Sequence, residues 1–564
     1  MNLQLRILYG AFVVAIIFIA SYNFIAVTDE TSHFSKIDRL FSAVDNYTSP
    51  GAAIAVIKDG KTIYSRGYGM ANLEYDIPIT SSSIFHVASV SKQFTAFAVT
   101  MLADQGKLSL NDDVRKYVSE VPDLGETITI RHLIHHTSGL RDQWELLAMA
   151  GWRLDDVITT EHILKMLENQ QELNFKPGEE YLYSNMGYTL LAEIVERVSG
   201  QSFTDWTQEH IFEPLGMDDT HFHNDHRHIV PGRAYSYQPV SDNGFQKSVL
   251  NYANVGATSL FTTVNDLAKW VKNFDDISVG NERIISQMHR QGRLNNGEQI
   301  SYAYALQVND YRGTSAVGHS GADAGYRSFV GRFPEHDFAV IVLSNLSTMS
   351  PQRIGYQIAD IIIGDNLKSV EPRIESEKRR RGEIDVSVID AYVGKYKMER
   401  GVIISLTRED DRLFMQTPGI TKVELIPKNE EVFFSNDIDL EITFESDKGA
   451  KADHLMVNRG GSTVMALRID GNKPTTEELQ QYTGKYYSEE LGTFYTIRLR
   501  DDELIAMHRR HSDIELTPII NNRFSGNQWW FRTVKFIKDD NDAVEGFRLT
   551  GGRVRDIWFE KREY

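Results

Sequence analysis

Runs of apolar residues near residue 50 predict a β-hairpin. Residues 52–57 are all apolar, and Asp59-Gly60 separates them from Thr62–Ser65, a short run that favours strands. An Asp-Gly pair between two such runs is typical of a tight hairpin turn. Far along the chain, the segment Asp337–Leu343 is apolar at every position after its first residue, which predicts a fully buried strand.

Between these strands the apolar spacing changes to that of helices. Residues 90–105 contain no glycine or proline, carry apolar side chains three and four positions apart and stop at Gly106, which predicts a buried helix. A second helix is expected over residues 187–198, with Gly200 just beyond its end. Strands at both ends with helices between them indicate a single α+β domain, placed at residues 28–365.

The last third of the chain repeats itself. Tyr392-Val-Gly-Lys-Tyr396 recurs as Tyr482-Thr-Gly-Lys-Tyr486, and similar segments follow in the same order after both copies. Each copy has short alternating strands with turn signals every ~8 to 12 residues, the pattern of a small antiparallel barrel. We therefore expect two β-barrels, at residues 385–470 and 471–564, joined to the first domain by the charged linker 366–384.

Aromatic residues are frequent in the second of these barrels. Trp529, Trp530, Trp558 and Tyr486 either fill the barrel interior or form a face that binds a glycan or another substrate. Their positions in the sequence leave both interpretations open.

Apolar residues also dominate residues 7–27, near the chain start. At about 1.5 Å per residue, a helix of this length spans about 30 Å, the thickness of a bilayer core. Residues 1–27 are therefore either a retained membrane anchor or a cleaved signal peptide. Since Arg6 precedes the run and acidic Asp29-Glu30 follows it, both alternatives place the rest of the chain outside the cytoplasm, periplasmic or extracellular.

Composition narrows the chemistry that these domains can carry out. The 564 residues have a formal net charge of −18, which repels phosphate backbones and argues against nucleic acid as the main partner. The chain has no cysteine, so thiolate zinc sites, iron–sulfur clusters and cysteine nucleophiles are excluded. Covalent catalysis must use another side chain.

Ser89-Val-Ser-Lys92 at the start of the first predicted helix is a candidate nucleophile and base. If Ser89 opens the helix, Lys92 lies one turn later on the same face and can reach the serine oxygen. A lysine crowded by apolar neighbours and by the positive end of a helix can lose its proton near neutral pH. The alternative is that Ser89 is only a helix cap.

Two further motifs can complete such a site. In Tyr183-Ser-Asn185, a phenol can transfer protons and an amide can orient a lysine and a substrate carbonyl. In His319-Ser320-Gly321, the glycine permits close backbone approach, and Phe329-Val330 downstream is expected to be an edge strand that offers an N–H group to an oxyanion.

In this order, the three motifs resemble the S-x-x-K, Y-x-N and K/H-x-G elements of the serine β-lactamase and penicillin-binding protein superfamily. The resemblance covers about residues 45–350, and its class C-like branch is favoured because Tyr183-Ser-Asn185 replaces Ser-Asp-Asn. Further segments resemble landmarks of that branch: Pro50-Gly51, Gly67-Tyr-Gly69, residues 128–140, Pro177-Gly178, residues 214–217 and residues 262–268. The resemblance implies an α+β catalytic domain with a helical lobe.

The resemblance also implies a role for each residue. Ser89 would be the acylated nucleophile, and Lys92 and Tyr183 would share the work of general base and acid. The residues that would bind or orient the substrate are Asn185, His319, Ser320 and Gly321. The oxyanion would lie between the backbone N–H groups of Ser89 and Ala322. Which of Lys92 and Tyr183 takes the first proton stays open. No metal or cofactor is implied.

The third motif departs from the lactamase pattern, because His319-Ser320-Gly321 replaces the usual Lys-Thr-Gly. A histidine that titrates near pH 6 to 7 takes the place of a permanent cation for the β-lactam carboxylate. We therefore expect poor β-lactam hydrolysis. Histidine here resembles D-Ala-D-Ala carboxypeptidases, D-aminopeptidases and esterases of the family.

A lactamase-like domain followed by two barrels resembles D-aminopeptidases with lipocalin-like barrels. The implied function is an exported serine peptidase or amidohydrolase on peptides that contain D-amino acids, with small peptides, amides or esters as substrates. A carboxylesterase on the same scaffold and a slowly acylated penicillin-binding sensor are the alternatives. The sequence gives no oligomeric state and does not identify a barrel loop that enters the site.

Two other sites have to be weighed. Gly318-His-Ser320-Gly-Ala322 resembles a degenerate G-x-S-x-G nucleophile elbow, which would need an acid and a histidine later in the chain. A dense polar cluster could hold a metal or form a polar loop. The cluster consists of His221, His223, Asp225, His226 and His228. The loop is favoured, because the spacing of these residues does not match that of a metal-ligand pair on a helix. His135-His136 is expected to form a turn near the active site.

Overall fold

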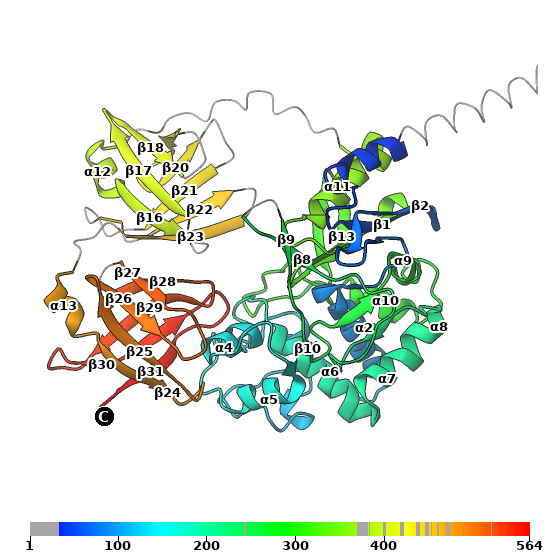
Figure 1. The fold of residues 1–564 in the computed structure, drawn as a ribbon, viewed down its shortest axis with the longest axis horizontal. Helices are drawn as coiled ribbons and strands as arrows, with labels where there is room; N and C mark the ends of the chain where they lie inside the picture. Colours follow the sequence, from blue (N-terminus) through cyan, green and yellow to red (C-terminus); the bar gives the residue numbers. More distant parts are fainter. Residues whose placement is uncertain are drawn as a thin grey trace, which may run out of the picture.

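The computed structural model describes three folded bodies (Figure 1). The described residues are 33–241, 244–368, 382, 384–398, 402–417, 422–435, 440–445, 451–452, 454–459, 462–469, 474–519 and 522–563. The apolar segment 7–27 and most of the expected linker 366–384 lie outside them. Within the described ranges, no helix is both long and apolar enough to cross a bilayer.

A six-stranded antiparallel sheet forms the centre of the first domain, in the order β12-β13-β14-β15-β1-β2. Its strands are β1 (Ala52–Lys58), β2 (Lys61–Tyr68), β12 (Gln307–Tyr311), β13 (Thr314–Asp323), β14 (Tyr326–Phe333) and β15 (Phe338–Ser344). The predicted hairpin is β1–β2, and the predicted buried strand is β15, which is buried at every position. Pairing of β1 with β15 brings the two ends of the domain together.

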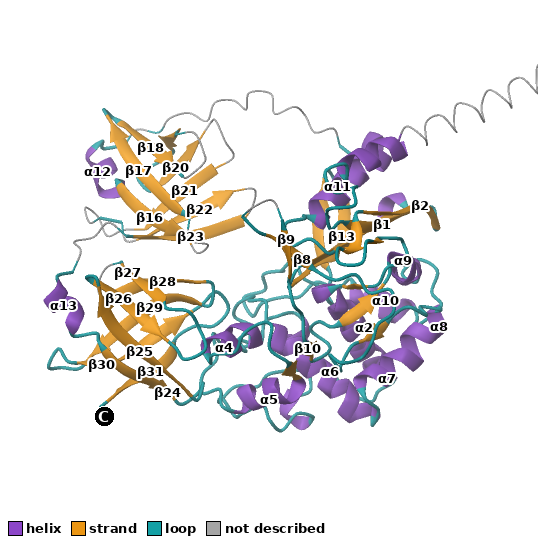
Figure 2. Cartoon of the chain, in the orientation of Figure 1, coloured by secondary structure: helices purple, strands orange, loops and turns teal. Residues whose placement is uncertain are grey.

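Helices cover both faces of this sheet (Figure 2). Helix α11 packs on β14 and β15, and α9 packs on β1 and β15. The predicted helices are present as α2 (Ser91–Asp104) and α6 (Asn185–Ser199), which pack against each other. The remaining helices of this domain are α3 (Ile130–Ile134), α4 (Gln143–Met149), α5 (Thr160–Glu168), α7 (Phe203–Thr207), α8 (Glu213–Leu215), α9 (Val264–Lys272), α10 (Glu282–Met288) and α11 (Pro351–Ile363).

Short strands connect the helical lobe to the sheet. They are β3 (Met70–Asn72), β4 (Ile77–Pro78), β5 (Phe85–His86), β6 (Ile158–Thr159), β7 (His221–Phe222), β8 (Tyr237–Pro239), β9 (Phe245–Lys247), β10 (Tyr252–Ala253) and β11 (Leu260–Thr262). In the three-stranded sheet β5-β11-β7, the central strand β11 pairs with β5. Strand β5 ends two residues before the Ala88–Val90 turn that leads into α2, so this small sheet positions the start of that helix.

Two closed eight-stranded antiparallel barrels follow. The first has β16 (Gly394–Met398), β17 (Ile403–Glu409), β18 (Arg412–Gln416), β19 (Val423–Pro427), β20 (Val432–Ser435), β21 (Leu440–Glu445), β22 (His454–Arg459) and β23 (Ser462–Arg468). The second has β24 (Gly484–Ser488), β25 (Thr493–Arg500), β26 (Glu503–Met507), β27 (Ile514–Pro518), β28 (Arg523–Gln528), β29 (Phe531–Lys538), β30 (Val544–Thr550) and β31 (Ile557–Arg562). The expected pair of barrels is confirmed.

The repeated motif has the same geometry in both barrels. A short helix, α12 (Ser387–Tyr392) or α13 (Thr476–Gln480), precedes the first strand. The Tyr396 hydroxyl donates to the Tyr392 carbonyl at 2.9 Å, and the Tyr486 hydroxyl donates to the Tyr482 carbonyl at 2.8 Å. The sequence repeat therefore preserves a specific hydrogen bond.

The four aromatic residues of the second barrel do not share one role. Tyr486 and Trp530 are buried in its core, Trp558 is half-buried, and Trp529 is 41% exposed. Core filling thus explains Tyr486 and Trp530. Trp529 faces a cleft of about 880 Å³ between the two barrels.

The second barrel docks on helix α4 of the first domain (Figure 1). The Tyr495 hydroxyl donates to the Met149 carbonyl at 3.0 Å, and His511 Nε2 donates to the Ala148 carbonyl at 2.8 Å. Helix α4 is buried along its whole length, and apolar residues of both bodies form one continuous core. The loop between β30 and β31 is thereby held against the first domain.

Candidate active site

Ser89 lies in a strained turn immediately before helix α2. It is the middle residue of the Ala88–Val90 turn, whereas α2 itself begins at Ser91, so Ser89 does not open the helix as expected. Ala88 has φ +48°, a backbone conformation that costs energy for any residue except glycine and that is common at active sites. The Ser328 hydroxyl donates to the Val87 carbonyl at 2.7 Å and fixes the turn from the sheet side.

Lys92 is fully buried in the first turn of α2 and reaches Ser89. Its ammonium group donates to Ser89 Oγ at 3.2 Å, to Asn185 Oδ1 at 2.8 Å and to the Ala257 carbonyl at 2.6 Å. Burial lowers the pKa of Lys92 to about 7, although nearby carboxylates oppose this shift. A substantial fraction is therefore neutral at pH 7 and can accept the serine proton.

Asn185 begins helix α6 and is held by Asp142. The Asp142 carboxylate accepts the side-chain amide of Asn185 at 2.7 Å and its backbone N–H at 2.8 Å. Asp142 is buried and also caps helix α4 through the Trp144 N–H at 3.0 Å. Asp142 is not among the site residues predicted from the sequence. The available signal was an aspartate at the start of a helix, which predicts only a cap.

Tyr183 faces Lys92 and keeps its proton. Its ring centroid lies 5.0 Å from Lys92 Nζ. Burial raises the pKa of Tyr183 well above its usual value, and its buried hydroxyl has no hydrogen-bond partner within the described part of the chain. A neutral phenol beside Lys92, with no hydrogen-bond partner for its hydroxyl in the described part of the chain, is suited to donate to a substrate.

His319-Ser320-Gly321-Ala322 runs along β13 beside the Ser89 turn. A Cβ atom on Gly321 would lie 3.0 Å from the Ser89 backbone nitrogen, so this glycine permits the approach that an oxyanion pair of Ser89 and Ala322 N–H groups requires. Strand β12 pairs with β13 only as far as Gly318. The rest of β13 has an open edge on that side among the described residues.

The expected edge strand at Phe329-Val330 is wrong. These residues lie in β14, which pairs with β13 on one side and β15 on the other. An apolar run does not distinguish an interior strand from an edge strand. The open edge beside Ser89 is formed by β13 itself, because β12 ends early.

His319 is a neutral, buried member of the site. Its Nδ1 donates to the Ser320 carbonyl at 2.6 Å, and its Nε2 accepts the Tyr302 hydroxyl at 3.0 Å. Burial lowers the pKa of His319 to about 4, so the expected titration near pH 6 to 7 does not occur. At neutral pH this position carries no charge for a substrate carboxylate.

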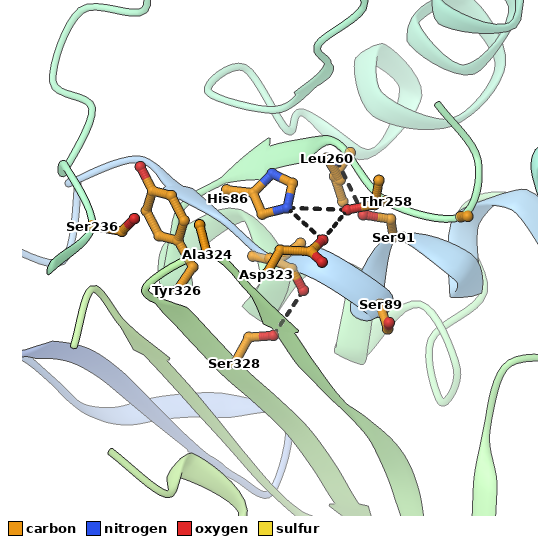
Figure 3. A network of polar contacts seen from close by, with 12 residues as sticks. His86, Ser89, Ser91, Ser236, Thr258, Leu260, Asp323, Ala324, Tyr326 and Ser328 are labelled. Carbon is orange, nitrogen blue, oxygen red and sulfur yellow. Dashed lines mark hydrogen bonds and ion pairs between the residues drawn. The ribbon is translucent and has the colours of Figure 1, made fainter. Parts of the chain in front are cut away.

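A polar network behind Ser89 joins three segments (Figure 3). The Asp323 carboxylate accepts the Thr258 hydroxyl and lies 3.0 Å from His86 Nε2. Ser91 Oγ accepts the Leu260 N–H at 3.0 Å. The network ties β13 to the start of α2, and the Asp323 charge is the largest influence that raises the pKa of Lys92 against the effect of burial.

The rival sites take other forms. Ser320 lies within a strand that continues into the β14 hairpin, whereas a nucleophile elbow joins a strand to a helix. His221 Nε2 lies 3.3 Å from His223 Nδ1, but no group of three or more potential ligands has a metal-binding arrangement in the described ranges. His136 has φ +57°, and its ring centroid lies 4.1 Å from that of Tyr183.

The second barrel contributes Arg553, which the sequence analysis missed. Its guanidinium carbon lies 4.9 Å from the Tyr183 ring centroid, and its Nη1 lies 3.9 Å from Asp142 Oδ2. The positive charge of Arg553 also lowers the pKa of Lys92. Arg553 is far from the motifs in sequence, and Gly-Gly-Arg gives only a turn signal.

Comparison with known proteins gives consistent results. The Beta-lactamase family model matches residues 37–362. A penicillin-binding protein of Bacillus subtilis (strain 168) is 30% identical over 452 residues, which cover 77% of this chain and 98% of that protein. A D-aminopeptidase of Brucella anthropi is 22% identical over 535 residues, covering 92% and 96%. The octameric penicillin-binding protein homologue from Pyrococcus abyssi shares the fold, with a TM-score of 0.53 at 24% identity over 86% of this chain and 99% of that one.

Proposed function

Because this chain belongs to the beta-lactamase family and is a serine hydrolase, we propose that it cleaves amide bonds in peptides containing D-amino acids through an acyl-enzyme on Ser89. The observation that carries this proposal is the hydrogen bond of 3.2 Å between buried Lys92 and Ser89. A relative named D-aminopeptidase that covers 92% of the chain supports the substrate class.

In the acylation step, neutral Lys92 takes the Ser89 proton as the serine oxygen bonds to the substrate carbonyl carbon. The oxyanion forms between the backbone N–H groups of Ser89 and Ala322. Tyr183 donates its proton to the leaving nitrogen as the C–N bond breaks, and the Lys92 ammonium returns a proton to Tyr183. Neutral Lys92, rather than Tyr183, is the first base, because burial raises the pKa of the phenol.

In the deacylation step, a water molecule attacks the acyl ester, and its proton passes to Lys92 or Tyr183 before Ser89 recovers it. The acid is then released, and the groups return to their starting protonation states. Asn185, fixed by Asp142, holds the Lys92 amine toward Ser89 throughout. The machinery is the same for an ester substrate, whose leaving oxygen needs less help from Tyr183.

The test compares two serine variants on one substrate panel. The chain is assayed with D-amino-acid amides, acyl-D-Ala-D-Ala peptides, p-nitrophenyl esters and a chromogenic cephalosporin. We expect Ser89→Ala to lower turnover by at least about 1000-fold and to abolish the acyl adduct seen by mass spectrometry. Ser320→Ala is the matched control and retains the adduct. Activity that survives in Ser89→Ala but not in Ser320→Ala would contradict the proposal.

The cephalosporin distinguishes a peptidase from a β-lactamase. A neutral histidine occupies position 319, where the β-lactamases that this chain resembles carry a lysine, so we expect slower turnover of this compound than of the D-Ala-D-Ala peptide. Turnover of esters alone would identify a carboxylesterase. A permanent penicillin adduct without turnover of any substrate would identify a slowly acylated sensor.

We also propose that the chain acts outside the cytoplasm, held to the membrane or exported by residues 1–27. The support is the apolar run 7–27 with Arg6 before it and Asp29-Glu30 after it. Fractionation of cells that produce the full chain tests this, together with the N-terminal sequence of the mature protein. Recovery of the full-length chain in the cytosol would contradict it.

A further inference from the structure

The loop at residues 551–556 carries Arg553 from the second barrel onto the catalytic domain. The Arg553 N–H donates to Glu145 Oε2 at 2.7 Å, and its carbonyl accepts the Asn174 side-chain amide at 2.9 Å. The Arg555 N–H donates to Asn174 Oδ1 at 2.8 Å. These backbone hydrogen bonds to the first domain fix the point from which the Arg553 side chain extends.

The Arg553 guanidinium is placed at the site with its hydrogen-bond donors unused within the described ranges. It lies over Tyr183, its side chain is 44% exposed, and it makes no hydrogen bond within the described ranges. The nearest carboxylate, Asp142 at 3.9 Å, already accepts both N–H groups of Asn185. By contrast, Arg555 on the same loop is paired with both oxygens of Glu180 at 3.2 and 2.9 Å.

The other basic groups of the site do not provide a permanent charge for a ligand. His319 is neutral at pH 7. Lys92 directs all its N–H groups at Ser89, Asn185 and Ala257. Arg553 is therefore a permanent cation at this site with free hydrogen-bond donors, and a planar guanidinium binds a carboxylate through two parallel hydrogen bonds.

We propose that Arg553 binds the carboxylate of the leaving group, so that the preferred substrates are peptides ending in a free α-amino acid. This rests on the proposed acyl-enzyme function. The Tyr183 hydroxyl protonates the leaving nitrogen, and in an α-amino acid the carboxylate carbon is two bonds from that nitrogen. A guanidinium over the Tyr183 ring is thus on the side of the site where this carboxylate emerges. Cleavage is of the carboxypeptidase type.

The experiment uses the full chain and a matched pair of substrates. Acyl-D-Ala-D-Ala and the same peptide with a C-terminal carboxamide differ only in the charge that Arg553 would bind. We expect the wild-type protein to have a higher kcat/KM for the free acid, and Arg553→Gln to lower that value by about 30-fold or more. The carboxamide should change by less than about threefold, which a merely structural role would not produce.

The control variant is Arg555→Ala, which loosens the same loop but leaves the Arg553 charge in place. It should alter both substrates by the same factor. Equal losses for both substrates in Arg553→Gln, or no preference for the free acid in the wild-type protein, would overturn the proposal.

A second readout separates this proposal from the acyl-enzyme function. Penicillins carry a carboxylate beside their scissile nitrogen, so the rate of Ser89 acylation by benzylpenicillin should also fall in Arg553→Gln. If esters and carboxamides acylate Ser89 but the free acid gains nothing from Arg553, only the carboxylate site is wrong. If no compound acylates Ser89, the proposed function fails and the carboxylate site with it.

Discussion

The pH dependence of acylation tests the central mechanistic step, the transfer of the Ser89 proton to neutral Lys92. With a Lys92 pKa of about 7, about one molecule in a hundred is neutral two pH units lower and about one in ten is neutral one unit lower. The value of kcat/KM should therefore be about 100-fold below its plateau at pH 5 and about 10-fold below it at pH 6. A p-nitrophenyl ester is the substrate, because its leaving group needs no proton.

Two charge variants should move this acidic limb in opposite directions. The Asp323 carboxylate raises the pKa of Lys92, whereas Arg553 lowers it. Asp323→Asn should therefore move the limb to lower pH, and Arg553→Gln should move it to higher pH. General damage to the fold would not give shifts of opposite sign.

The measurement is kcat/KM for the ester from about pH 5 to about pH 9, with the fold checked by circular dichroism at each end. A profile that is flat across this range, or shifts with the same sign in both variants, would refute Lys92 as the base. Lys165→Ala, which changes an exposed lysine of α5, is the control and should leave the profile unchanged.

Three further predictions concern stability and packing. Glu145 is buried, and its pKa is raised from 4.5 to about 7, so its contribution to stability is lost as pH rises through that range. Relative to the wild-type protein, Glu145→Gln should therefore gain about 3 kcal/mol in free energy of unfolding between pH 4 and pH 8, measured with urea. An equal difference at both pH values would contradict this. Gly321→Ala would place a Cβ 2.3 Å from the Val87 carbonyl oxygen and 2.4 Å from Ser328 Oγ. The substitution should reduce acylation and cost about 1–3 kcal/mol of folding free energy. Acylation at the wild-type rate would refute the need for close contact between β13 and the Ser89 turn. Tyr396→Phe and Tyr486→Phe each remove the same repeated hydrogen bond and should each cost about 1 kcal/mol or more; thermal unfolding that is unchanged in both would show that the bond is unimportant.

Local pattern was sufficient for the elements that carry the catalytic motifs. The three-residue spacing of Ser89 and Lys92 predicts their proximity without any tertiary information, although Ser89 lies in the turn before α2 and not in the helix itself. The αL glycine at the end of α6, Gly200 with φ +75°, is likewise a local feature. The order of the motifs then supplies the fold of the first domain by resemblance, whereas the two barrels follow from the internal repeat and its alternating strands.

Properties that depend on burial could not be read in the same way. The charge of His319 is set mainly by desolvation and by the nearby Lys92, and neither is encoded near position 319. The wrong edge strand at Phe329-Val330 has the same origin, because strand order depends on which partners arrive from elsewhere. Asp142 stands where a helix cap is expected from the sequence, and it caps α4. Its hydrogen bonds to Asn185 form only when α4 packs beside the start of α6.

The internal repeat does not predict Arg553 at the site. Both copies have a Gly-Gly pair at the corresponding place, 460–461 in the first and 551–552 in the second, but Ser462 follows the first pair and Arg553 the second. Equivalence between the copies therefore predicts no cation here. The copy that packs on α4 is also the copy that carries the charge, since Tyr495 and His511 hold that barrel against the catalytic domain. Combining Arg553→Ser with Ser462→Arg moves the charge to the other copy. The preference for a free C-terminal carboxylate should then be as low as in Arg553→Ser alone, because a guanidinium can reach the site only from the barrel that is docked on it.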